Sequence, residues 1–218
     1  PYVNTWTYSL YASSGNMHPW YIPAGGVLKM FDSTSDMQAI WQSGVWSTNY
    51  RNITEANFKN CVYATRGALT DDLPNHYPKT REVTRFTAVI GTIQNAPAAQ
   101  ISETRKNEIL AEARLCRGLH MYNLLHVFGP VPLIVNPEDV ENPEALVNAE
   151  RPALDDITKW IYDDFEFAAK NAPESQVEKG RFTRDFARVM LMRHCLNEGY
   201  HMDGYYQKAL DMYTELNT

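Results

Sequence analysis

The sequence predicts an all-α protein, a tetratricopeptide-like helical repeat scaffold with long irregular loops. Apolar residues recur three or four positions apart along several long segments, which is the period of an amphipathic helix. No two segments show the alternation of period two that paired strands would show. The last two helical segments and their turn, residues 183–216, have the length of one tetratricopeptide repeat.

Composition limits the classes of partner. The chain has 218 residues and a formal net charge of −6, and its Lys and Arg residues do not cluster with aromatic residues. Nucleic acid and anionic membrane surfaces are therefore not expected as partners. No segment reaches the roughly 18 consecutive apolar residues that a membrane-spanning helix needs. No P-loop, dinucleotide fingerprint or nucleophile elbow occurs, so we expect no cofactor.

The first part of the chain is rich in loops. Residues 1–36 mix aromatic residues with Gly, Ser, Asn and Pro, which break any helical period. From about Met37 to Ala68 the helical period returns. Residues 82–94 fit either a short helix or an extended segment. The predicted organisation of residues 1–218 is a loop-rich candidate ligand segment, 1–36, followed by a helical scaffold, 37–218.

A long central helix is predicted from Ser102, a suitable N-cap, to about Phe128. Its C-terminal half is apolar on nearly all sides, so we expect it to lie buried between other helices. Gly118 would let one of them approach closely. Gly129 can adopt a positive φ and Pro130 cannot continue a helix, so residues 129–151 are expected to form a long crossover connection.

Three further helices are predicted at residues 154–171, from Thr183 to before Gly199, and from about Gly204 to Leu216. Trp160 and the three cysteines, Cys61, Cys116 and Cys195, are expected to pack as buried apolar side chains.

Four segments resemble the SusD/RagB family of Bacteroidota surface lipoproteins. The most recognisable combines Glu112, Ala113, Arg117 and Tyr122 with the run from Phe128 to Leu133, FGPVPL, although Gly118 stands where the family usually has alanine. The other three are a W-x3-Y-x2-I-x2-A-N pattern, an I-x2-D-L-x2-A-x3-L-P helix and a G-R-x-T segment. They occur at Trp46 to Asn57, Ile157 to Pro173 and Gly180 to Leu196.

The resemblance implies a binding protein rather than an enzyme. Family members are lipid-anchored on the outer face of the outer membrane. They pass oligosaccharides, or in some cases peptides, to a SusC-like TonB-dependent transporter. They are usually much longer, and this chain shows neither their C-terminal part nor their acylated N-terminal cysteine. We therefore expect it to be the N-terminal portion of such a protein, with membrane contact only through a lipid anchor outside this sequence.

The candidate ligand site lies in the first loop-rich segment. Sugars present apolar CH faces beside hydroxyl groups, so they bind to aromatic rings flanked by hydrogen-bonding side chains. The irregular segment around Trp20 has this composition and shows no periodic face that would assign it to a core. The predicted ligand-binding residues are Asn16, His18, Trp20, Tyr21, Asp32 and Trp41. Packing within the loop is the alternative role for them.

Other chemistries have less support. His194, Glu198 and His201 lie around one helix end, but the spacing is not HExxH and no further ligand is evident, so no metal site is expected. The pairs Asp155-Asp156 and Asp163-Asp164 are expected to be solvated or capping charges, not glycosidase carboxylates facing each other across a cleft.

The leading hypothesis for the function is non-catalytic oligosaccharide binding. The alternatives are a peptide-binding member of the same family and a helical-repeat adaptor for other proteins; a glycoside hydrolase has the least support.

Overall fold

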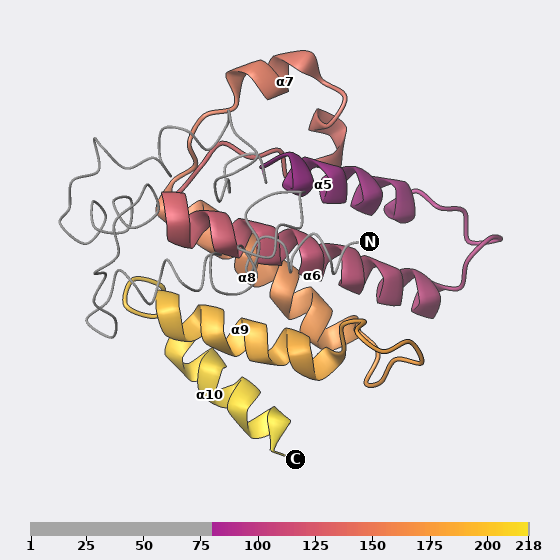
Figure 1. Ribbon diagram of the computed structural model, residues 1–218, viewed down its shortest axis with the longest axis vertical. Helices are drawn as coiled ribbons and strands as arrows, with labels where there is room; N and C mark the ends of the chain where they lie inside the picture. The colour runs from indigo at the N-terminus through magenta and orange to yellow at the C-terminus, as the bar shows by residue number, and fades with distance from the viewer. Residues whose placement is uncertain (1–79, 218) are drawn as a thin grey trace, which may run out of the picture. The chain divides into compact units, whose positions relative to one another are not determined.

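The computed structural model describes residues 80–217, which belong to one compact unit, Thr80–Thr218 (Figure 1). This part of the chain contains helices and no strands, which confirms the predicted fold class. The predicted boundary between residues 36 and 37 lies outside it. The elements, in chain order, are α5 (Thr80–Gln94), α6 (Glu103–Phe128), the 3-10 helix η4 (Pro137–Asp139), α7 (Pro143–Asn148), α8 (Leu154–Asn171), α9 (Arg184–Glu198) and α10 (Tyr205–Leu216).

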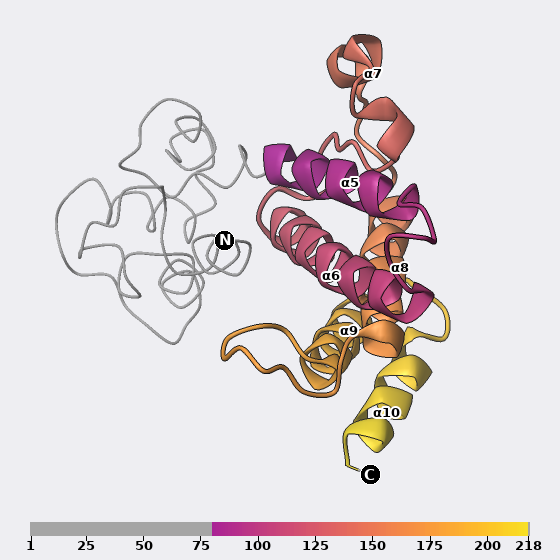
Figure 2. The same cartoon turned by 90° about the vertical axis from the view of Figure 1, so that its right-hand side faces the viewer.

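Sequential helices pack against one another: α5 against α6, α6 against α8, α8 against α9, and α9 against α10. In Figures 1 and 2, α5, α6, α9 and α10 follow one another from top to bottom, and α8 crosses beside α6. None of the helices in residues 80–217 has the length and apolar character that crossing a membrane requires.

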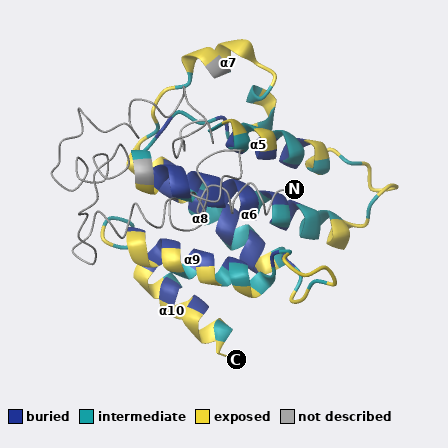
Figure 3. Ribbon diagram, viewed as in Figure 1, coloured by how far each residue is buried: buried dark blue, intermediate teal, exposed yellow. Residues whose placement is uncertain are grey.

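The central helix begins and ends where the sequence predicts. Ser102 Oγ accepts a hydrogen bond from the backbone N–H of Arg105 at 3.3 Å, and so caps the first turn of α6. Gly129 ends the helix with φ of 68° and donates its N–H to the Leu125 carbonyl at 2.9 Å. Figure 3 shows α6 largely buried along its middle, where the buried residues run from Leu110 to Leu125.

Gly118 permits the closest approach of α6 and α8. A Cβ added there would lie 2.8 Å from Phe165 Cε1 and 3.2 Å from Asp164 Cβ. Both distances are shorter than ordinary carbon contacts, so a larger residue would push the two helices apart. The predicted role of this glycine is confirmed.

The segment with two possible structures is α5. Val83, Phe86 and Ile90 are buried and share one face of this helix. Its β-branched residues resemble those of a strand, but packing against α6 favours the helix. Thr87 lies on the same buried face and donates its hydroxyl to the Ile134 carbonyl at 2.9 Å.

The connection after α6 contains two short helices that the sequence analysis did not predict. Each begins with a proline, Pro137 in η4 and Pro143 in α7, at a position where the missing N–H is not needed. Asn142 caps α7 by accepting a hydrogen bond from Glu144 N at 3.0 Å. The predicted long connection after α6 is therefore partly helical.

The last two helices form the predicted hairpin. Thr183 caps α9 through its hydroxyl, which accepts from Phe186 N at 3.4 Å, and Gly204 precedes α10 with φ of 79°. Cys116 and Cys195 are buried as expected, whereas Cys61 lies outside the described residues. Trp160, predicted to be core, is only half-buried on α8.

Candidate functional site

All six residues predicted to bind ligand lie outside the described part of the chain. Because each precedes residue 80, their ligand role stays a prediction. They are Asn16, His18, Trp20, Tyr21, Asp32 and Trp41. The described unit offers three other features with binding chemistry: a pocket between α8 and α10, exposed aromatic side chains on the hairpin of α9 and α10, and a cluster of histidines and carboxylates.

The pocket between α8 and α10 is open and has a volume of about 530 Å³. The rings of Tyr162 and Tyr205 stack beside it with their centroids 4.9 Å apart. Aromatic and charged side chains therefore meet in one hollow, a combination found in sites for polar organic ligands. The lining residues are Lys159 and Tyr162 of α8, Met202, Asp203 and Gly204 of the connection, and Tyr205, Gln207, Lys208 and Asp211 of α10.

An ion-pair network beside this pocket is centred on Glu166. Its carboxylate lies 3.0 Å from Lys170 Nζ and 3.1 Å from Lys208 Nζ, and it accepts the Tyr162 hydroxyl at 3.0 Å. Burial alone would raise the pKa of the Glu166 carboxyl, but the three hydrogen bonds outweigh burial and lower this pKa to about 2. Burial and the bond to Glu166 raise the pKa of Tyr162. The carboxylate therefore fixes Lys208 against α8 and shapes the wall of the pocket.

A second network is buried between α5, α6 and α8. The Arg117 guanidinium donates to both oxygens of Asp164, at 2.7 and 2.9 Å, and Arg114 Nε donates to the same carboxylate at 2.8 Å. Arg117 also donates to the Thr87 hydroxyl and to the Val135 carbonyl. Asp164 is fully buried, so its predicted place on the solvated surface was wrong. Its partners lie on a different helix, and the arrangement is a structural ion pair.

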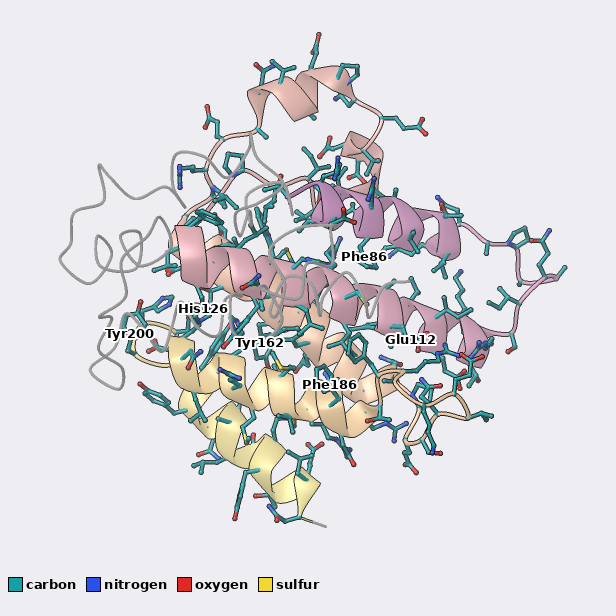
Figure 4. All side chains as sticks on the ribbon, viewed as in Figure 1. Phe86, Glu112, His126, Tyr162, Phe186 and Tyr200 are labelled. Atoms are coloured by element: carbon teal, nitrogen blue, oxygen red, sulfur yellow. The ribbon has the colours of Figure 1, made fainter. Side chains whose placement is uncertain are left out.

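A third contact joins two of the recognisable sequence segments. Arg181, in the G-R-x-T segment, donates through Nε to Glu112 of α6 at 2.9 Å, and Gln176 donates to the same carboxylate at 3.2 Å. Figure 4 shows Glu112 beside the connection between α8 and α9. These residues and Arg117 form contacts that join the helices of the described unit. The recognisable motifs are therefore tied to the fold of this unit.

The histidine–carboxylate cluster consists of His126, Asp155, Glu198 and His201. His201 Nε2 lies 2.9 Å from Glu198 Oε2, and its Nδ1 lies 3.0 Å from Asp155 Oδ1. His126 Nε2 lies 3.6 Å from the other Glu198 oxygen. Figure 4 labels His126 and Tyr200 at the end of the unit where α9 passes into α10.

His194 does not join this cluster. It is buried, and its Nε2 donates to the Thr158 carbonyl at 2.9 Å. Burial lowers the pKa of His194 to about 4, despite the opposing effect of that hydrogen bond, so the ring is neutral at pH 7. Within residues 80–217, no group of three or more His, Cys, Asp or Glu side chains has an arrangement suited to a metal ion.

The sequence analysis did not single out the exposed aromatic residues of the hairpin. Tyr200 is 71% exposed, and Tyr206 and Tyr213 are 52% and 60% exposed, with the exposed Leu210 between them on α10. The spacing of residues 206, 210 and 213 places them on one helix face, about 100° around the helix from the buried face of Tyr205. That spacing was the available signal, because it leaves an apolar face in addition to the one that packs on α9.

Comparison with known proteins places the scaffold in a family. A family model described as "Starch-binding associating with outer membrane" matches residues 25–196, and the chain belongs to this SusD-like family. A SusD-like protein of Bacteroides ovatus is 34% identical over 123 residues, which cover 54% of this chain and 22% of that protein. The aligned residues thus cover about a fifth of the length of this curated relative.

Solved structures share the fold. A surface glycan-binding protein A from Bacteroides fluxus matches 99% of this chain and 43% of its own, with a TM-score of 0.70 and 19% identity. A laminarin-binding SusD-like protein matches 99% of this chain and 42% of its own, with a TM-score of 0.67 and 20% identity. At these identities the likeness establishes the architecture.

Proposed function

We propose that this chain is part of a non-catalytic cell-surface protein that binds an oligosaccharide and delivers it to a SusC-like TonB-dependent outer-membrane transporter. The observation that carries the proposal is the family match over residues 25–196, in a family described as starch-binding and associated with the outer membrane. Two proteins of the same fold are described as binding laminarin and glycan. Attachment through a lipid anchor, on the outer face of that membrane, belongs to the same proposal.

The proposed ligand contacts are those of the loop-rich segment, with Trp20 and Tyr21 as the aromatic surfaces. A ring that covers about 80 Å² of a sugar contributes roughly 2 kcal/mol at about 25 cal/mol per Å². Two rings with a few polar contacts, after the cost of association, correspond to dissociation constants on the order of 0.01 to 1 mM. Asn16, His18 and Asp32 would supply hydrogen bonds to hydroxyl groups, and Trp41 would extend the site.

The test is calorimetric titration of the full chain with maltooligosaccharides, laminarin oligosaccharides and a parallel set of short peptides. We expect saturable binding to one glycan class. Each lost ring is worth roughly 2 kcal/mol, about a 30-fold loss in affinity, so Trp20→Ala with Tyr21→Ala should abolish detectable binding. Val177→Ala is the control, because it truncates an exposed apolar side chain outside the three features with binding chemistry. Circular dichroism must show unchanged helix content in all variants.

Each other outcome would count against one part of the proposal. Binding to peptides and to no glycan would replace the sugar by a peptide as cargo. Unchanged affinity in the Trp20 and Tyr21 variant would refute the site. Absence of binding to both the glycans and the peptides would favour a helical adaptor for proteins. Release of reducing sugar would contradict a non-catalytic role. Copurification of the acylated protein with a TonB-dependent transporter from outer membranes would test the partner.

A further inference from the structure

In the connection between α9 and α10, residues 199–204, one histidine lies between carboxylates of two helices. His201 lies with Nε2 at 2.9 Å from Glu198 at the end of α9, and with Nδ1 at 3.0 Å from Asp155 in the first turn of α8. Both neighbours are carboxylates, which accept hydrogen bonds and donate none when ionised. The geometry is therefore fully satisfied only when both ring nitrogens carry a proton.

A neutral imidazole has one N–H and can serve only one of the two carboxylates. Glu198 is 6% exposed, whereas the Asp155 side chain is 73% exposed. A buried carboxylate that loses its donor has no water to replace it, so the neutral ring keeps its bond to Glu198. Asp155, which water can solvate, loses its bond.

We propose that His201 is a pH-sensitive latch that ties the α9–α10 connection to the start of α8 when its imidazole is protonated, and that releases Asp155 when the imidazole is neutral. The same connection supplies Met202, Asp203 and Gly204 to one wall of the pocket between α8 and α10. The latch therefore makes that wall more firmly held at acidic pH than at alkaline pH.

The other titratable groups around His201 do not replace it in this role. His126 of α6 faces the opposite oxygen of Glu198, and its Nδ1 donates to the Tyr122 carbonyl at 2.8 Å. His194 of α9 is neutral above about pH 4, because burial lowers its pKa. Burial also raises the pKa of Tyr205 at the start of α10, so that hydroxyl is uncharged. His201 is thus the group in contact with both Glu198 and Asp155.

Amide hydrogen exchange of the full chain tests the latch locally. The reporters are the N–H groups of Met202, which donates to the Glu198 carbonyl at 3.0 Å, and of Tyr205, which donates to the Met202 carbonyl at 3.3 Å. At about pH 5.5, Asp155→Asn should speed their exchange by about 1.5- to 5-fold, the usual range for an exposed ion pair. At about pH 8 it should have no effect.

Asp156→Asn is the matched control, because it removes the neighbouring carboxylate from the same first turn of α8 and should leave both amides unchanged. In a His201→Gln background, Asp155→Asn should no longer change exchange at about pH 5.5, since no imidazolium remains. Equal rates in Asp155→Asn and the unaltered protein at acidic pH would overturn the latch. An equal acceleration at both pH values, or one that persists in His201→Gln, would overturn it as well.

Discussion

Replacing Gly118 by alanine sets two effects of known size against each other. Alanine is favoured over glycine in a helix interior by about 1 kcal/mol. The new Cβ, however, would lie 2.8 and 2.9 Å from two carbons of the Phe165 ring. Phe165 is fully buried, so the ring cannot swing into solvent, and such overpacking typically costs about 1 to 3 kcal/mol. We expect a net loss of about 1 kcal/mol, with about 2 kcal/mol as the upper value.

Urea unfolding followed by circular dichroism measures this difference directly. Gly199→Ala is the control, because its Cβ would also collide with a ring, that of Tyr206. Tyr206 is 52% exposed and can move, and Gly199 has φ of −63°, which alanine adopts readily. We expect a change of less than about 0.5 kcal/mol there, as for a surface substitution. Greater stability of Gly118→Ala relative to the unaltered protein would refute the close-approach argument.

Two further predictions concern buried charge. Asp164→Asn should destabilise the unit by about 3 to 5 kcal/mol in urea unfolding, because it leaves the Arg117 guanidinium buried without its counter-ion; a loss below about 1 kcal/mol would contradict the buried pair. His194 has a pKa of about 4 when folded and about 6.5 when unfolded, so the unfolded chain binds the proton first as pH falls. Stability should decline by about 3 kcal/mol between about pH 6.5 and pH 4, and His194→Gln should flatten that decline.

The helix ends that could be predicted are those marked by local chemistry. Ser102 and Thr183 cap their helices with their own hydroxyl groups, and Gly129 ends α6 by adopting a positive φ. These signals need only a few neighbouring residues, so they can be interpreted without the fold. The helical state of α5 could not be predicted from local signals, because its β-branched residues fit either a helix or a strand. Packing of Val83 and its neighbours on α6 decides between the two.

Partners far apart in the sequence could not be predicted. In the sequence, nothing distinguishes Asp164 from its neighbour Asp163. In the structure, Asp163 pairs with Lys159 at the surface, whereas Asp164 is buried. The difference comes from Arg117 and Arg114, which lie 47 and 50 residues away. Trp160 is half-buried for a related reason, since its exposure depends on which neighbouring elements cover that part of α8.

The histidines at the end of α9 show the same limit. Their spacing brought His194, Glu198 and His201 together as a possible metal site, and the structure does place His201 against Glu198. His194, however, turns inward to a backbone carbonyl, and the other partner of His201 is Asp155, which the sequence spacing does not connect to it. Spacing along one helix shows which side chains share a face. The side chains that this face contacts depend on how a second helix packs against it.

The residues that made the family recognisable have mechanical roles in the described unit. Glu112 bonds to Arg181 and Arg117 bonds to Asp164, and each pair joins segments that are distant in the sequence. A charge held in such a pair cannot be replaced without leaving its partner buried or unpaired, whereas a loop residue that contacts ligand can change with the ligand. The motifs therefore identify the scaffold. The proposed ligand contacts around Trp20 must be tested by binding measurements, because the motifs carry no information about the ligand.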